Sequence, residues 1–589
     1  MPSGSGRKLA SEWCEVIAFG DKVKCKHCHE VISKRAQRIK QHLQKCKKRI
    51  SSSATFSAPV SPSPTDVEDL QPPSKVMKLD SSEGESSHVQ SHLLRKNEQT
   101  SISSYAVRTT TAQKCDIDKK IAKFFYANNV AFNVANSKHF INMITTLRPG
   151  YNPPDNTQLS GRLLDDVLEE VELHLKHELS EQTSLTLILD GWTNNNNDSI
   201  FACSIHTGTK AHLLRATDCG AEKKTAEFCA NIGKACIEEI KEKYGQEIFA
   251  ICADNENKMN AVSAKLKLLY PHMITYGCSA HVINLCVKDI IPNILLEHVV
   301  KVQKHFRNKH NAHGWLTEKH GLMPQIPCDT RWNSQQECLR TFVANFHKYN
   351  EIRLEHMQEF DQQISNILTN AGIYAEASNL LKQLKILSEA LNNLQSDTAN
   401  LSDAVQIWLH ILNHEILEHY HPQLMKRFQQ NIQPFHLLAY ITDPSKCFGE
   451  QLSAEQEELA EQWLLEMHPK FLPYLLKLKI KDSDIFPAIM FNEDILSKFS
   501  AKKWWHVIKQ RVMKKTDNHN DNTATAVKEF CEFLMKLHSC PPTSASIERI
   551  FSSYGLIWSK LRNRLGAKKA ENLVKIYKFF KTDAEADDC

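Results

Sequence analysis

The sequence has few glycines, no long apolar run and no compact cysteine framework. Glycine accounts for only 18 of the 589 residues, which favours long helices over a loop-rich all-β fold. No stretch reaches the roughly 18 uninterrupted apolar residues of a membrane span, and the first residues contain no apolar signal core. The 18 cysteines are scattered along the chain, as expected of reduced thiols with at most one metal site. We therefore expect an intracellular protein with no membrane partner.

The length and the charge distribution indicate several domains behind a basic head. A chain of 589 residues is too long for one hydrophobic core. Residues 1–50 contain 13 Lys and Arg against 4 Asp and Glu, a net charge of +9, so the rest must sum to −4 to give the total of +5. A basic head fits a nucleic-acid-binding module. A basic N-terminal segment is equally consistent with a tail that only directs the protein to the nucleus.

Four residues near the N-terminus have the spacing of zinc ligands. Cys25 and Cys28 form a Cys-x2-Cys pair, and His42 and Cys46 lie four residues apart, on one face of a helix. So small a module cannot bury enough apolar surface alone, and Zn²⁺ binding would drive its folding. Three nearby residues are alternative zinc ligands: Cys14, His27 and His29. If they do not bind zinc, they are exposed polar positions that flank the ligand set.

The N-terminal module resembles a BED-type zinc finger. The resemblance is carried by Trp13, Phe19, the cysteine pair and the segment 38–46, Arg-Ile-Lys-Gln-His-Leu-Gln-Lys-Cys. Fingers of this family bind DNA and occur on transposases and proteins derived from them. Many end in His where this chain has Cys46, though Cys is also accepted. Three basic side chains between the ligand pairs are candidate phosphate contacts: Arg35, Arg38 and Lys40.

A linker and a helical segment follow the finger. Residues 51–112 are rich in Ser, Pro and Thr, and such a composition predicts a disordered linker. Apolar residues at helical spacing then predict helices from Ile117 to Leu147 and again around Leu164 to Leu175. We assign residues 113–180 to a helical domain. Its apolar faces form either an ordinary helical core or a dimer surface. The segments 45–49 and 73–80 each have the composition of a nuclear import signal, or are incidentally basic.

The order of elements after residue 180 predicts an RNase H-like core. Strands are expected at 185–189, 200–207, 212–218, 248–253 and 274–277, with helices after the third, fourth and fifth. In the order βββαβαβα the first and fourth strands are parallel neighbours through a right-handed crossover. Asp190 and Asp254 would then end side by side, where ligands gather. Either aspartate alone could be a turn residue or a helix N-cap. Two adjacent carboxylates repel each other, and a bound Mg²⁺ or Mn²⁺ removes that cost, so the pair indicates a metal site.

The third carboxylate of such a site comes late in the sequence. Residues 286–525 show helical periodicity with buried-type Leu and Trp, and we expect a helical insertion there. Glu548 follows in a new helix that begins after Pro541-Pro542. A glutamate in a first helical turn is common because of the helix dipole, so spacing alone does not identify this residue as a ligand.

Four motifs together resemble the hAT transposase family over nearly the whole chain. They are Asp190-Gly-Trp-Thr193, Asp254-Asn255, Cys278-Ser-Ala-His281 with Asn284-Leu285, and Arg331-Trp332; the segment from Ser546 through Leu565 resembles the family's C-terminal dimerisation region. The resemblance implies a DDE triad of Asp190, Asp254 and Glu548 that holds two Mg²⁺ ions. It further implies that Trp332 stacks on a displaced base and that His281 lies near the scissile phosphate. Arg331 and Arg549 are then candidate phosphate contacts, and Cys278 a packing residue.

The sequence as a whole predicts an α+β multidomain protein with a BED finger and an RNase H-like core. This core has a mixed five-stranded sheet, and the all-helical insertion splits it into an N-terminal portion at 181–285 and a C-terminal portion at 526–582. The expected function is cut-and-paste DNA transposition in the nucleus, acting on transposon ends and target DNA as a homodimer or higher oligomer. The finger would hold structural Zn²⁺. The alternatives are a domesticated regulator without catalytic activity and an interaction scaffold that uses the insertion.

Overall fold

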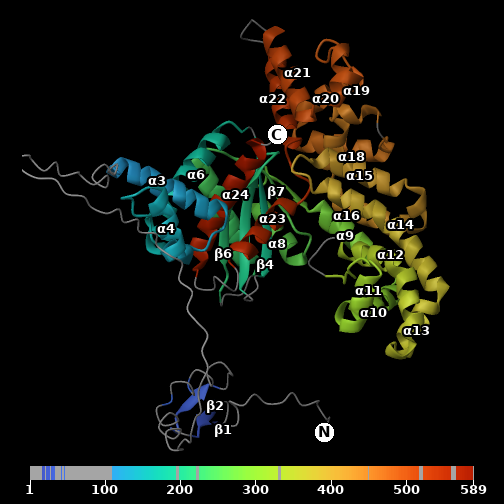
Figure 1. The fold of residues 1–589 in the computed structure, drawn as a ribbon. Coiled ribbons are helices and arrows are strands. Elements are labelled where there is room, and N and C mark those ends of the chain that lie inside the picture. The colour runs from blue at the N-terminus through green and yellow to red at the C-terminus, as the bar shows by residue number, and fades with distance from the viewer. Residues whose placement is uncertain are drawn as a thin grey trace, which may run out of the picture. The chain divides into compact units, whose positions relative to one another are not determined.

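The computed structural model describes residues 16–19, 22–26, 28–33, 42, 46, 109–182, 184–193, 198–220, 225–328, 333–448, 450–515, 522–558 and 565–587. The chain divides into two compact units, Met1–Glu98 and Gln99–Cys589 (Figure 1). In the described part of the first unit, β1 (Val16–Phe19), β2 (Lys22–Cys25) and β3 (Val31–Ser33) form an antiparallel sheet in the order β1-β2-β3. Most of the expected linker, residues 51–108, lies outside the described residues.

The second unit begins with a small helical layer. The periodicity between 117 and 147 predicts helix throughout, but α3 ends at Ala127 and the backbone turns through a left-handed Asn129 (φ +52°). The chain resumes as α4, where the Ser137 hydroxyl accepts the Phe140 N–H and caps the helix. Phe125 and Phe140 then pack edge to face with ring centres 5.3 Å apart. The elements are α3 (Thr111–Ala127), η3 (Phe132–Asn136), α4 (Lys138–Leu147), α5 (Asn156–Leu159) and α6 (Arg162–Ser180).

A five-stranded mixed sheet forms the centre of the second unit, in the order β6-β5-β4-β7-β8. Strands β4, β5 and β6 pair antiparallel, whereas β7 and β8 run parallel to β4. This order confirms the predicted RNase H-like arrangement, with the first and fourth core strands as neighbours. The strands are β4 (Leu185–Thr193), β5 (Ser199–His206), β6 (Ala211–Asp218), β7 (Ile248–Ala253) and β8 (Ile274–Gly277), and the helices between and after them are α7 (Ala226–Tyr244), α8 (Asn257–Leu269) and α9 (Ser279–Ile290).

Alternate residues of the central strands enter two different apolar cores. Leu189 and Ala253 pack in the core on the side of α7 and α8, whereas Ile188 and Cys252 belong to the larger core that also includes the late helices. The C-terminal helices α23 (Ala545–Ile557) and α24 (Ala567–Asp587), red in Figure 1, lie against the sheet although they come last in the chain. Helix α24 contacts β6, α6 and α3, and so joins the helical layer to the sheet.

The segment between α9 and α23 contains helices and connecting loops but no strand among its described residues. Trp408 is fully buried, which confirms its interpretation as a core residue, and Trp504 and Trp505 are buried with it at no more than 1% exposure. No single helix in the described ranges is long and apolar enough to cross a membrane; α9 and α10 meet that test only as a pair bent by 92°. The α-helices are α10 (Asn293–Asn308), α11 (His310–Glu318), α12 (Ser334–Glu355), α13 (Gln362–Thr369), α14 (Ala371–Leu394), α15 (Leu401–Leu412), α16 (His421–Asn431), α17 (Pro434–Ile441), α18 (Ala454–Met467), α19 (Leu472–Lys479), α20 (Glu493–Lys498), α21 (Ala501–Lys515) and α22 (Asn522–Leu537). The 3-10 helices are η4 (Met357–Glu359), η5 (Glu415–Tyr420), η6 (Pro444–Phe448), η7 (Pro469–Phe471) and η8 (Ala488–Phe491).

Candidate active site and zinc site

The two aspartates lie side by side on neighbouring parallel strands. Leu189 of β4 is paired with Ala253, the last residue of β7, so Asp190 in β4 and Asp254 directly after β7 continue in the same register. Neighbouring strands are about 4.8 Å apart, and residues of the same register point to the same face. Both carboxylates therefore project from the sheet opposite to Leu189 and Ala253. Local N–H groups hold them: Gly191 donates to Asp190 Oδ1 (2.6 Å) and Glu256 to Asp254 Oδ1 (3.3 Å).

Strand β4 continues beyond the aspartate at which the sequence predicted its end. It extends to Thr193, because Gly191 and Thr193 pair with Phe201 and Ser199 of β5. The Asp-Gly-Trp-Thr motif is therefore extended strand rather than a turn. This extension places the Trp192 side chain beyond the carboxylate on the rim of the sheet.

Glu548 is brought to the aspartates by the segment that precedes α23. The Tyr276 hydroxyl donates to the Pro541 carbonyl (2.7 Å), and the Ser279 N–H donates to the Pro542 carbonyl (3.0 Å). The Ser544 N–H then donates to the Cys278 sulfur (3.3 Å), so Cys278 serves packing and backbone positioning. Burial raises the pKa of this thiol to about 12, which keeps it neutral in that role.

Trp192 holds α23 from the other side. Its ring stacks on Phe551 with centres 5.6 Å apart and planes 14° apart, and it also contacts Tyr554 (6.1 Å). Phe551 follows Glu548 by three residues, and therefore lies on the same side of the helix. Trp192, two residues after Asp190, thus fixes α23, the helix that carries Glu548. No pattern in the sequence indicated this contact, because its two partners come from opposite ends of the core.

Burial and the charges of Asp190 and Asp254 affect the ionisation of Glu548. The pKa of Glu548 is raised to about 8, chiefly by burial and further by the charges of Asp190 and Asp254, against a smaller opposing effect of Arg549. Like charges at close range disfavour simultaneous ionisation, and a divalent cation removes that penalty. The donor set consists of carboxylate oxygens, which Mg²⁺ and Mn²⁺ prefer. The residues present therefore fit the expected metal.

His281 extends the site along α9. Its Nδ1 lies 3.1 Å from Asp254 Oδ1, with the imidazole 29% and the carboxylate 20% exposed. Asn255 and Gly277 form the base beneath it. The Asn255 amide donates to the Cys278 carbonyl (2.7 Å), and a Cβ on Gly277 would lie 1.8 Å from Asn255 Oδ1. Only glycine fits at position 277 with Asn255 in place.

The predicted DNA contacts have different outcomes. The Arg549 guanidinium bonds to the Gln395 carbonyl (3.0 Å) and to the Asp397 carboxylate, so in this structure it ties α23 to the end of α14. Arg331 and Trp332 lie outside the described residues, as do Arg35, Arg38 and Lys40 of the finger. Their roles remain predictions.

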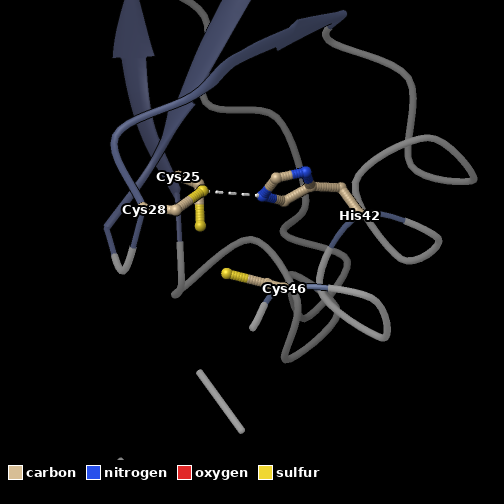
Figure 2. A group of neighbouring side chains, drawn as sticks. All are labelled: Cys25, Cys28, His42 and Cys46. Carbon is tan, nitrogen blue, oxygen red and sulfur yellow. Dashed lines mark hydrogen bonds between the residues drawn. The ribbon is translucent and has the colours of Figure 1, made fainter. Parts of the chain in front are cut away.

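The four predicted zinc ligands converge in the first unit (Figure 2). The ligand atoms of Cys25, Cys28, His42 and Cys46 all lie within 4.8 Å of one another. Cys28 Sγ is 3.2 Å from His42 Nε2, and Cys25 and Cys46 are buried. Three sulfurs and one imidazole nitrogen around a common centre fit tetrahedral Zn²⁺.

Glu30 is a further member of the zinc site that the sequence did not reveal. Its Oε2 lies 3.5 Å from His42 Nδ1, the ring nitrogen opposite the one that faces Cys28. A carboxylate on that nitrogen orients a metal-bound imidazole and fixes its tautomer. His29, one of the alternative zinc ligands, is exposed and adopts a left-handed backbone (φ +63°) at the turn after the cysteine pair.

One protein family matches a segment of this chain. Residues 154–306 match a family described as a domain of unknown function, DUF659, which is associated with hAT-type transposases. The match covers α6, all five strands of the core sheet, both aspartates and His281. It ends before Glu548. No curated protein matches the chain.

Proposed function

We propose that this protein is a cut-and-paste DNA transposase of the hAT type that cleaves and joins DNA with divalent metal ions. The observation that carries the proposal is the register that sets Asp190 and Asp254 side by side, together with the hydrogen bonds that tie the segment before Glu548 to Tyr276 and Cys278. The raised pKa of Glu548, due chiefly to burial and further to the charges of Asp190 and Asp254, supports a shared site. The family match to a domain associated with hAT transposases supports the same class of activity.

The three carboxylates would hold two Mg²⁺ or Mn²⁺ ions. When bound, such ions lower the pKa of a water or a 3′-OH and stabilise the leaving oxygen of a phosphodiester. Around them, the protein orients its own groups. Asp254 keeps the His281 imidazole at 3.1 Å, where a ring N–H can donate a hydrogen bond to a phosphate oxygen. Trp192 and the Ser544–Cys278 hydrogen bond hold α23, and with it Glu548, in register with the aspartates.

The remaining regions take roles that follow from the family resemblance. The finger 1–50 and the helical domain 113–180 bind transposon ends, with Zn²⁺ holding the finger. Arg331 contacts phosphates and Trp332 receives a displaced base by stacking, whereas Arg549 braces α23 against the end of α14. The insertion 286–525 separates the N-terminal portion of the core (181–285) from the C-terminal portion (526–582), which would also mediate a homodimer or larger assembly. The protein would act in the nucleus.

The experiment is metal-dependent nicking of DNA that carries the terminal repeats flanking the gene. Wild type should nick with Mg²⁺ or Mn²⁺ and not without added divalent cation. Asp190→Asn, Asp254→Asn and Glu548→Gln should each reduce the rate by at least about 100-fold. Glu529→Gln, a half-buried site on α22 whose side chain pairs with Lys470, is the matched control and should cleave as wild type does. Equal rates for all variants would show that the three acids are not the catalytic group.

The second candidate is a domesticated DNA-binding regulator that keeps the fold without cleaving. The absence of flanking inverted repeats and a single genomic copy would favour it. Its biochemical signature is a wild type that binds DNA through the finger and leaves it intact with either metal. The intact set of three acids favours the enzyme.

A further inference from the structure

A polar groove lies beside the candidate active site, between the core and the insertion. It has a volume of about 810 Å³ and begins at Asn255, the residue after Asp254. One wall is α8 with the edge strand β8, and the opposite wall is α16 of the insertion. The groove follows the open edge of β8 from Thr275 to Gly277, the carboxyl end of that strand, where ligands usually bind in such sheets. The function proposed above assigns no ligand to this groove.

Amide side chains dominate this groove. Six of its lining residues are Asn or Gln and none is acidic, in a chain with 68 acidic residues. From α8 come Asn257 and Asn260, both exposed, and from α16 come the exposed Gln430 and the buried Asn431. An amide presents one donor and one acceptor side by side, which is the pattern offered by the edge of a nucleotide base.

One buried amide group at the groove has no partner. Asn431 is 3% exposed, and its Oδ1 accepts the Trp408 indole N–H (2.9 Å). Because the indole N–H can only donate, this bond identifies the oxygen and the nitrogen of the Asn431 amide. Its Nδ2 is buried and, among the described residues, makes no hydrogen bond. A buried donor left unsatisfied is costly, and such groups are rare unless a ligand or water completes them.

The cations of the groove are engaged elsewhere, which argues against a simple phosphate site. Arg427 forms a two-pronged pair with Asp289 of α9 (2.8 and 3.1 Å), and this pair joins α16 to α9. Lys267 donates to the carbonyls of Pro271 and Met273 (2.8 and 2.5 Å). An extended peptide added to the edge of β8 fits less well, because β8 has four residues and the facing wall offers amides in place of apolar pockets.

We propose that this groove binds an unpaired base of a DNA strand whose phosphate lies at the three carboxylates. That the ligand is a DNA strand rests on the proposed function. That the groove binds a base of this strand, and not its phosphates, follows from the amide side chains of the groove. Amides on two fixed walls would hold the base by its edge. Adenine suits them best, because its N6 and N7 match an Asn or Gln side chain in two bonds.

The test measures binding of the full-length protein to labelled single strands without added Mg²⁺. The probes are an oligo-dA strand and an abasic strand of the same length, which keeps the phosphates and lacks the bases. Asn260→Ala combined with Gln430→Ala removes one amide from each wall at exposed positions. Gln429→Ala, exposed on α16 but not lining the groove, is the matched control.

Wild type should bind oligo-dA more tightly than the abasic strand, and the double variant should weaken oligo-dA binding by about fivefold or more. Gln429→Ala should leave both affinities unchanged. Equal weakening of both probes would indicate a phosphate site and overturn the base assignment, as would no weakening at all. Binding of an extended peptide in place of the strand would overturn it too. Because no cleavage is needed, a protein that binds as predicted but never nicks DNA would refute the proposed function and leave the groove standing.

Discussion

The substitution Glu548→Gln should stabilise the metal-free protein while abolishing its activity. The reason lies in the raised pKa of Glu548, about 8 against an ordinary value of 4.5. Between these two values the folded protein keeps a proton that the unfolded chain releases, so stability falls as pH rises from 4.5 to 8. Below 4.5 both states are protonated and the penalty vanishes. Glutamine resembles the protonated side chain and carries no penalty at any pH.

The shift sets the size of the effect. A pH of 7 is about 2.5 units above the pKa of this carboxyl in the unfolded chain and still below its pKa in the folded protein. Keeping the proton on Glu548 therefore lowers the free energy of unfolding at pH 7 by about 3 kcal/mol. A unit of the size of Gln99–Cys589 unfolds with an entropy of about 1 kcal/mol per degree, so the melting temperature should rise by about 3 °C. At pH 4 the variant and the wild type should melt together. The buried histidines, which gain protons on unfolding at low pH, affect both proteins equally and cancel.

Thermal melts of the full-length proteins at pH 4 and pH 7, in buffer without added divalent cations, measure this difference. The matched control is Glu571→Gln on α24, where a buried glutamate accepts from Lys575 (2.9 Å) and Lys568 (3.2 Å). That substitution should lower the melting temperature at pH 7, because it leaves two ammonium groups without their partner. Mg²⁺ should raise the melting temperature of wild type more than that of Glu548→Gln. An equal gain at both pH values, or none at pH 7, would refute the raised pKa of Glu548.

Three further predictions concern the supports of the two sites. Trp192→Ala should slow metal-dependent nicking by about ten- to a hundredfold, because α23 loses its stacking partner, whereas Trp192→Phe should recover most of the rate; unchanged kinetics for the alanine variant would contradict this positioning role. Gly277→Ala should destabilise the core by about 1–3 kcal/mol in denaturant unfolding, because its Cβ displaces Asn255; a neutral result would mean that Asn255 moves freely. Cys25→Ser should remove stoichiometric zinc from the full-length protein in elemental analysis, and retained zinc would contradict the ligand assignment.

The sheet and the two aspartates could be predicted because their signals are local. Apolar runs that end in Asp190 and Asp254 identify strands, and the order of strands and helices then determines which two become neighbours. The zinc ligands are equally readable, since Cys25, Cys28, His42 and Cys46 are defined by spacing. In each case a short pattern carries the information, and a topological rule supplies the rest.

The supports of the site could not be predicted, because they depend on contacts between distant segments. The stacking of Trp192 on Phe551 joins residues from opposite ends of the core, and no periodicity relates them. The continuation of β4 through Thr193 depends on pairing with β5, which overrides the turn propensity of Gly191. Glu30 is one exposed acid among many until the fold brings it to His42.

The long insertion does not loosen the third acid, because its helices form part of the frame that holds Glu548. The Thr543 hydroxyl donates to the Leu394 carbonyl (3.4 Å) and Arg549 to the Gln395 carbonyl (3.0 Å), so both bonds reach the end of α14 from either side of the glutamate. The core sheet grips the same segment through the bond from Tyr276 to Pro541. Glu548 therefore begins a helix fixed at once by the sheet and by the insertion. Separation along the sequence costs entropy mainly when the chain first closes the loop, and that cost grows only slowly with length. Once the insertion has folded, a distant glutamate is held as firmly as a neighbouring one.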